Sequence, residues 1–222
     1  MSPDGRSTDL FESHPDALPG TETLAEGAIL LRGFLIGEAA ALLTHVNAIA
    51  AVAPFRRMVT PGGCQMSVAM SNCGSTGWIT DRRGYRYDSI DPETGLPWPA
   101  MPALILEAAV RAAAAGGFEG FQPNACLINR YEPGARLSLH QDKDERDFTA
   151  PIVSVSLGLP AVFLFGGARR TGRPQRYRLN HGDVAVWGGP ARLAYHGVAP
   201  LADGEHPVAG RQRINLTIRE AG

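Results

Sequence analysis

Apolar side chains follow two different periods along this chain. Between Gly37 and Val52 they recur every three or four positions, which predicts an amphipathic helix. Residues Pro102 to Ala115 predict a second helix, because proline stands near its start and Gly116-Gly117 follows its end. A short apolar run at Ala28 to Leu31 predicts a strand. Both helices are rich in alanine, which suits close packing against a sheet.

After Gly117 the apolar positions alternate in short runs that glycine and proline separate. The predicted strands are Ala125 to Tyr131, Ile152 to Gly158, Ala161 to Phe165, Arg176 to Leu179, Val184 to Trp187, Leu193 to His196 and Arg213 to Arg219. Short strands at close spacing are typical of a sandwich or barrel. The pattern therefore predicts helices first and then a β body that can enclose a pocket.

A long segment from Pro54 to Ala100 shows little helical period and contains many glycine, proline and aromatic residues. Within it, residues Trp78 to Tyr87 interleave aromatic side chains with arginine. Bases stack on aromatic rings while arginine binds phosphate, so this stretch suits a single-stranded nucleic acid. An ordinary β-hairpin turning at Gly84, with arginine in solvent, explains the same pattern.

The last predicted strand, Arg213 to Arg219, alternates strictly. Ile214, Leu216 and Ile218 point to one side, and the polar residues between them point to the other. Two arginines on one face can each hold a carboxylate through a bidentate contact, which predicts a dicarboxylate site. A strand face in water would look similar, although such faces usually mix charges. Leu127 to Tyr131 likewise places Asn129 and Tyr131 on one face.

A metal site is indicated by His140 and Asp142, which lie two residues apart at the end of an alternating run. This spacing directs a nitrogen and an oxygen ligand to one point, and His196 is the candidate third ligand. Two histidines and one carboxylate facing a dicarboxylate-binding strand indicate Fe(II) with 2-oxoglutarate. A second His-x-Asp, His181-Gly182-Asp183, has the composition of a tight turn and is assigned as one.

Composition, charge and cysteine content narrow the classes of protein to which the chain can belong. The 222 residues carry a formal net charge of -1, which gives no global case for binding nucleic acid. Lys143 is the one lysine among 21 basic residues, and five arginines within residues 169–178 predict a local basic patch. Three cysteines without a Cys-x-x-Cys spacing, and no signal pattern or membrane-length apolar run, favour a reduced cytoplasmic protein.

Four stretches of the chain resemble the AlkB family of Fe(II)- and 2-oxoglutarate-dependent dioxygenases, and the similarity runs from about Gly27 to the C-terminus. These stretches are residues 58–63, 67–74, 126–145 and 182–189. The resemblance implies an α+β fold: a double-stranded β-helix, or jelly-roll, with N-terminal helices packed on the sheet and a nucleotide-recognition lid. We expect a flexible lead-in at residues 1–22 and one domain at 23–222, with the lid at about 54–100 and the core at about 117–222.

The resemblance also implies roles for individual residues. Iron is assigned to His140, Asp142 and His196. Co-substrate contacts are assigned to Asn129 and Tyr131, to Arg213 at the distal carboxylate, and to Asn215 and Arg219 near the chelating end. Substrate contacts are assigned to Trp78, Tyr85, Arg86, Tyr87, Asp144 and Arg170. In this assignment the base stacks between Trp78 and His196, Tyr85 contacts phosphate, and Asp144 faces the exocyclic nitrogen of the base.

The activity implied is oxidative demethylation of 1-methyladenine and 3-methylcytosine in DNA, which would repair the base by direct reversal. Fe(II) would be the cofactor, with 2-oxoglutarate and O₂ as co-substrates and aldehyde, succinate and CO₂ as products. The expected partner is single-stranded DNA, with double-stranded DNA and RNA as further substrates. We expect a monomer with no obligate protein partner and no membrane association. Two alternatives stay open: a dioxygenase of the same fold acting on tRNA or protein, and a binding module whose site no longer turns over.

Overall fold

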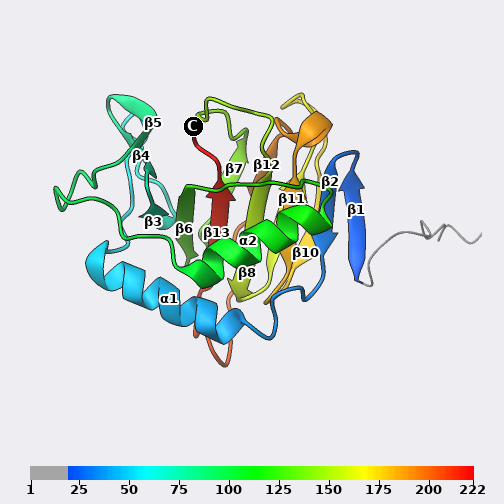
Figure 1. Ribbon diagram of the computed structural model, residues 1–222, viewed down its shortest axis with the longest axis horizontal. Coiled ribbons are helices and arrows are strands. Elements are labelled where there is room, and N and C mark those ends of the chain that lie inside the picture. The colour runs from blue at the N-terminus through cyan, green and yellow to red at the C-terminus, as the bar shows by residue number, and fades with distance from the viewer. Residues whose placement is uncertain (1–19) are drawn as a thin grey trace, which may run out of the picture.

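The computed structural model describes residues 20–222 (Figure 1). Most of the predicted lead-in, residues 1–19, lies outside the described residues. The end of that segment differs from the prediction, because the first strand, β1 (Thr21–Ala25), already begins within it. β1 forms an antiparallel hairpin with β2 (Ala28–Leu31), the strand that the sequence predicted.

Two antiparallel sheets form the body of the fold. In spatial order, the seven-stranded major sheet contains β1, β2, β11 (Val184–Trp187), β8 (Ile152–Gly158), β13 (Arg213–Arg219), β6 (Ala125–Tyr131) and β3 (Ala69–Gly74). The four-stranded minor sheet contains β10 (Gln175–Leu179), β9 (Ala161–Phe165), β12 (His196–Val198) and β7 (Leu137–His140). This arrangement confirms the predicted jelly-roll.

Both helices cover the same face of the major sheet, α1 (Ala39–Val52) beside β3 and α2 (Ala103–Ala115) across β8 (Figure 1). Their buried side chains join one apolar cluster with Ile214, Leu216 and Ile218 of β13. A second apolar cluster includes Leu30, Phe163 and Trp187 and fills the space between the sheets. Every residue of β13 is buried, so its polar side cannot be a solvated outer face. That side faces the minor sheet.

The aromatic and arginine-rich stretch is a β-hairpin, formed by β4 (Gly77–Asp81) and β5 (Gly84–Asp88). It is a separate two-stranded sheet, so we call it the lid hairpin. The range predicted for the lid, residues 54–100, also contains β3, which belongs to the major sheet. The bounds of the lid stay a prediction. Likewise β1, β2 and β3 extend the core to residues before 117.

One predicted strand is wrong. Residues Leu193 to His196 do not form a strand, because the chain first makes a 3-10 turn at Gly189–Ala191 and β12 begins only at His196. The side chain of Arg192 turns inward here, and Leu193 is 37% exposed.

The second His-x-Asp is confirmed as a turn. Gly182 has a φ of +85°, a conformation that glycine adopts without strain. Asp183 accepts hydrogen bonds from the backbone of Gly33 and of Asn180, so it closes the turn. Among residues 20–222, no helix is long and apolar enough to cross a membrane.

Candidate active site

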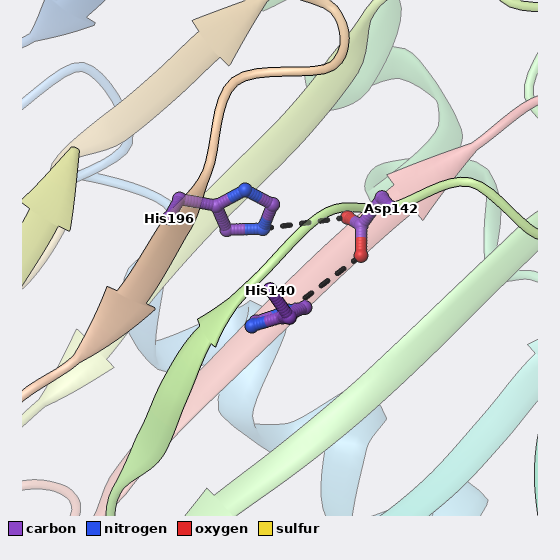
Figure 2. A group of neighbouring side chains, drawn as sticks. All are labelled: His140, Asp142 and His196. Atoms are coloured by element: carbon purple, nitrogen blue, oxygen red, sulfur yellow. Dashed lines mark ion pairs between the residues drawn. The ribbon is translucent and has the colours of Figure 1, made fainter. Parts of the chain in front are cut away.

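Strand register brings the two candidate histidine ligands together. In the minor sheet, His196 on β12 lies directly opposite His140 at the end of β7. Asp142 follows two residues beyond β7, and its carboxylate lies beside both rings (Figure 2). Its carboxylate oxygens lie 3.7 Å from Nε2 of His140 and 3.6 Å from Nε2 of His196. One ligand atom from each residue lies within 4.8 Å of the others.

Both imidazoles are held in the orientation that a metal ligand needs. Nδ1–H of His140 donates to the carbonyl of Ser138 at 2.8 Å, and Nδ1–H of His196 donates to the carbonyl of Ala194 at 3.0 Å. These bonds place the proton on Nδ1 in each ring, so the lone pair of Nε2 faces Asp142. Burial and the neighbouring His140 lower the pKa of His196 to about 4, which keeps the ring neutral.

Asp142 is kept ionised although it is buried. Burial alone would raise the pKa of its carboxyl group, but Arg219 and the two histidines hold the pKa well below its usual value. Nη2 of Arg219 donates to Oδ2 of Asp142 at 2.6 Å. Two imidazoles and one carboxylate, all from one side, form the donor set of non-haem Fe(II) oxygenases. The residues therefore fit Fe(II).

The inner end of the cavity holds a buried cation that has no anionic partner among residues 20–222. The Arg213 guanidinium is 1% exposed and stacks 5.0 Å from the Tyr131 ring centre. Nη2 donates to Ser156 Oγ at 2.9 Å, whereas Nε and Nη1 have no partner among the described residues. Burial also lowers the pKa of Arg213. Because an unpaired buried charge is costly, this geometry fits a carboxylate of a ligand.

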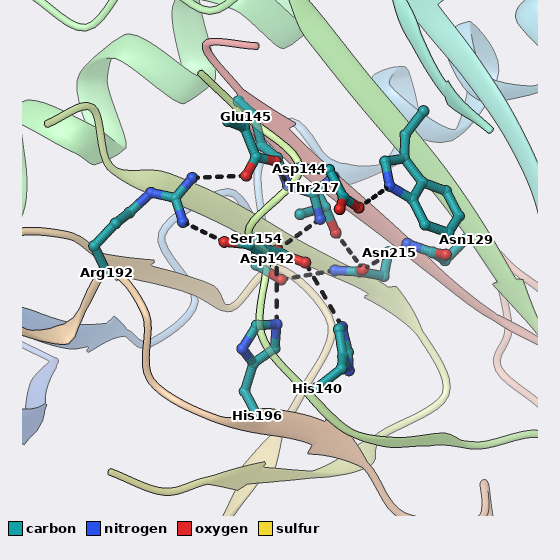
Figure 3. Close-up of polar contacts among 12 residues, drawn as sticks. Asn129, His140, Asp142, Asp144, Glu145, Ser154, Arg192, His196, Asn215 and Thr217 are labelled. Carbon is teal, nitrogen blue, oxygen red and sulfur yellow. Dashed lines mark hydrogen bonds and ion pairs between the residues drawn. The ribbon is translucent and has the colours of Figure 1, made fainter. Parts of the chain in front are cut away.

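Neutral polar groups continue along the same face of β13. Asn215 Nδ2 donates to Ser154 Oγ at 2.8 Å and Asn129 Nδ2 donates to Asn215 Oδ1 at 3.2 Å (Figure 3). Thr217 Oγ1 also donates to Asn215 Oδ1, at 3.0 Å. Asn129 Oδ1 is buried without a partner among residues 20–222. These bonds fix the side chains that the sequence assigned to 2-oxoglutarate, so the polar face fits that co-substrate.

A single cavity of about 830 Å³ joins this inner end, the metal ligands and an aromatic mouth. At the mouth, Trp78 and Tyr85 of the lid hairpin stack with ring centres 5.7 Å apart. Nε1 of Trp78 donates to Oδ2 of Asp144 at 2.7 Å. Arg170 also lines the cavity. Four of the six predicted substrate contacts therefore lie together with the metal ligands.

The other two predicted substrate contacts, Arg86 and Tyr87, do not line the cavity. Arg86 forms an ion pair with Asp81 on the lid hairpin itself. The Tyr87 hydroxyl donates to Glu145 at 2.6 Å. The roles assigned to both in contacting a nucleotide stay predictions.

The predicted stacking surface on His196 is also crowded. Its ring is buried, and the ring centres of His140 and Trp187 lie 4.5 Å and 4.9 Å away. The side chain of His140, by contrast, is 39% exposed and lines the cavity. His140 therefore offers the accessible imidazole face.

Four functional candidates were missed from the sequence. Glu145 and Arg192 form a buried ion pair at 3.1 Å beside the metal ligands (Figure 3). Arg136 and Lys143 line the mouth and form no ion pair in the described part of the chain. Glu145 sits in the charged run Asp142 to Arg146, so nothing local distinguishes it from a solvated acid. The cations at the mouth follow only from the folded arrangement.

Comparisons with known proteins agree with this geometry. Residues 27–219 match the sequence profile of the 2OG-Fe(II) oxygenase superfamily. The chain is 58% identical over 214 residues to the alpha-ketoglutarate-dependent dioxygenase AlkB of Escherichia coli, covering 96% of this chain and 98% of that protein. It is 35% identical over 133 residues to the nucleic acid dioxygenase ALKBH1 of Mus musculus, covering 58% of this chain and 33% of that protein. The solved structure of OsALKBH1 superposes with a TM-score of 0.79 at 27% identity, covering 90% of this chain and 99% of that one.

Proposed function

This chain belongs to the 2OG-Fe(II) oxygenase superfamily, as an Fe(II)- and 2-oxoglutarate-dependent dioxygenase of the AlkB type, and we propose that it removes alkyl groups oxidatively from nucleic-acid bases. One observation carries the proposal. A single cavity places the metal ligands between an inner end that fits a dicarboxylate and an aromatic, cationic mouth. The favoured substrates are 1-methyladenine and 3-methylcytosine in DNA, with RNA as a second class.

The geometry gives separate roles to the metal, the co-substrate and the side chains of the cavity. When bound, Fe(II) and 2-oxoglutarate supply the power to activate O₂ and oxidise the N-alkyl carbon. His140, Asp142 and His196 would hold the iron, and Arg213 would bind the distal carboxylate of 2-oxoglutarate. The N-methyl group, once hydroxylated, would leave as formaldehyde, and the positive charge of the base would leave with it as a proton released to solvent.

The chain's residues at the mouth suit a flat, positively charged base. We propose that the base stacks between Trp78 and His140, in place of the Trp78 and His196 pair that the resemblance implied. Both rings line the cavity, and the His140 side chain is 39% exposed whereas that of His196 is 7% exposed. A cationic methylated base gains about 1 kcal/mol from the indole ring. Oδ1 of Asp144 is left to face the exocyclic nitrogen, because Oδ2 is bound to Trp78.

Strand binding is supported by cations around the mouth. Arg136, Lys143 and Arg170 line the cavity without a carboxylate partner in residues 20–222, which suits phosphates on either side of an extruded base. A methylated pairing edge lowers the cost of extrusion, and a single strand removes most of it. We therefore propose a preference for single strands. A monomer in the cytoplasm is consistent with three free cysteines, two of them buried.

Mass spectrometry of an oligonucleotide carrying 1-methyladenine tests the proposal. The complete reaction contains protein, Fe(II), 2-oxoglutarate, ascorbate and air, and we expect loss of the methyl group with release of formaldehyde. Matched reactions omit 2-oxoglutarate or use His140→Ala, and neither is expected to change the oligonucleotide. DNA and RNA versions of one sequence then give the preference between them.

Two other results would redirect the assignment. If 2-oxoglutarate is consumed while both oligonucleotides stay methylated, the enzyme is a dioxygenase with another substrate, such as tRNA or a protein side chain. If iron-loaded protein binds the strand but consumes no 2-oxoglutarate, the chain acts as a binding module.

A further inference from the structure

Glu145 is the centre of a buried polar cluster that the proposed reaction does not use. Its side chain is 1% exposed, and it receives three groups from three different parts of the chain. Arg192 donates to Oε2 at 3.1 Å, and Tyr87 donates to Oε1 at 2.6 Å. Nε of Arg219 lies 3.4 Å from Oε1. The two guanidinium groups therefore compensate two buried carboxylates, because Arg219 also pairs with Asp142.

This cluster reaches the metal ligand Asp142 from two sides. Arg219 donates through Nη2 to Oδ2 of Asp142, and through Nη1 to the Tyr87 hydroxyl at 3.2 Å. Arg192 donates to the backbone carbonyl of Asp142 at 2.8 Å. Both the side chain and the backbone of Asp142 are thus oriented by residues that Glu145 holds in place. Burial raises the pKa of Tyr87, so its hydroxyl keeps the proton that it donates.

The lid hairpin is bound to the segment after Asp142 at two adjacent positions. Trp78 and Tyr87 are opposite each other in the hairpin register. Trp78 donates to Asp144 and Tyr87 donates to Glu145, the next residue along the chain. We call these two hydrogen bonds the hairpin clamp. The clamp joins the lid hairpin to the segment that carries Asp142.

We propose that Tyr87 and Glu145 are positioning residues that couple the lid hairpin to the metal ligand Asp142. Tyr87 acts within the protein rather than on the nucleotide. A bound metal fixes Asp142, which fixes Arg219 and, through Glu145 and Tyr87, the lid hairpin. By reciprocity, a hairpin held in place by the clamp strengthens metal retention. The coupling depends on the metal site alone, so it stands whichever substrate the mouth binds.

Hydrogen exchange of the lid hairpin amides tests the coupling without turnover. Wild type would be compared without metal and with Mn(II) and 2-oxoglutarate under argon. We expect the metal to slow exchange across residues 77–88 by about fivefold or more in wild type. In Tyr87→Phe this metal-dependent slowing should fall to less than half. Tyr177→Phe is the matched control, because its hydroxyl contacts Leu24 and Gln175, far from the clamp in the fold, on β10.

A second variant changes the acceptor of the hydrogen bond that Tyr87 donates. Glu145→Gln should weaken Mn(II) binding by about tenfold in a chelator competition, as the loss of a partner behind a metal ligand does. Thermal unfolding reports whether each variant folds. Three results would overturn the inference. The first is a wild-type protein whose hairpin exchange the metal does not slow, and the second is full metal-dependent slowing in Tyr87→Phe. The third is hairpin exchange in either variant that rises equally with and without metal. The first needs no variant, so it decides the matter even if both substitutions prevent folding.

Discussion

The two ends of the cavity are built differently. At the inner end, the polar side chains of β13 are buried, and Arg213 and Asn215 donate hydrogen bonds to the neighbouring strand β8. At the mouth, Tyr85 is 49% exposed, and the lid hairpin belongs to neither main sheet. The unsatisfied groups differ as well. In the described part of the chain, the inner end leaves one buried guanidinium without an anion, whereas the mouth presents solvated cations.

This difference separates an inner end that accepts one ligand geometry from a mouth that accepts many strands. A guanidinium held on a central strand accepts one ligand geometry, because moving it would disturb the sheet. Stacking rings and exposed cations accept many strands, because every base has an aromatic face and every nucleotide a phosphate. We therefore expect changes at the inner end to affect the co-substrate, and changes at the mouth to affect the nucleic acid.

The largest expected effect on turnover comes from a substitution at the metal site, where the inner end and the mouth of the cavity meet. Asp142→Ala should abolish turnover, because it removes the carboxylate ligand, while the affinity for a single strand at the mouth is kept. Turnover by mass spectrometry and strand binding by fluorescence anisotropy measure the two separately. Asp203→Ala is the control, since this exposed carboxylate pairs with Arg211. Equal loss of both quantities in Asp142→Ala would remove the distinction between the two ends.

At the inner end, Arg213→Gln should raise the KM for 2-oxoglutarate by about 100-fold or more. The expected loss is about 3 kcal/mol, because one partner of a buried charge pair disappears. The KM for the oligonucleotide should change little. Arg211→Gln, on an exposed side chain just before β13, is the matched control and should behave as wild type. A comparable rise in both KM values would contradict the separation.

At the mouth, Trp78→Ala should raise the KM for the oligonucleotide by about tenfold. Removing the ring that one base stacks on costs about 1–2 kcal/mol. The KM for 2-oxoglutarate should stay close to wild type. Trp78→Phe keeps a stacking ring but loses the indole N–H, so it should recover most of the strand affinity. If Phe is as poor as Ala, the bond to Asp144 rather than the stacking is what the mouth needs.

The smallest effects are expected for single cations at the mouth. Lys143→Gln and Arg170→Gln should each weaken binding of a single strand two- to threefold at moderate salt, since each removes one exposed charge. The slope of log affinity against log salt should fall by about 0.7 for each phosphate that the variant no longer binds. A slope that does not change would mean that the side chain meets no phosphate.

Much of this arrangement was accessible from the sequence, because its signals are local. The alternation in β13 predicted which side chains face the cavity, and the apolar period predicted α1 and α2 to within two residues. The His140 and Asp142 spacing predicted a shared metal position, and the structure agrees. Each of these signals repeats over a few residues of one element.

The predictions that failed depend on contacts between distant segments of the chain. The strand expected at Leu193 does not form, because Arg192 turns inward to Glu145, 47 residues away. Tyr87 looked like part of an exposed aromatic surface, yet its hydroxyl enters the same cluster. A periodic pattern gives the direction of a side chain along its own strand. It does not give the partner that makes burial of a charge favourable.

The unpaired guanidinium of Arg213 has a consequence for the lifetime of the protein. A ligand that binds only the folded chain lowers the unfolded fraction by mass action, by about 100-fold when its concentration is 100 times its Kd. Proteases act on that fraction, so abundance depends on ligand supply. When 2-oxoglutarate is scarce, each enzyme molecule would therefore turn over more slowly, and fewer folded molecules would survive in the cell.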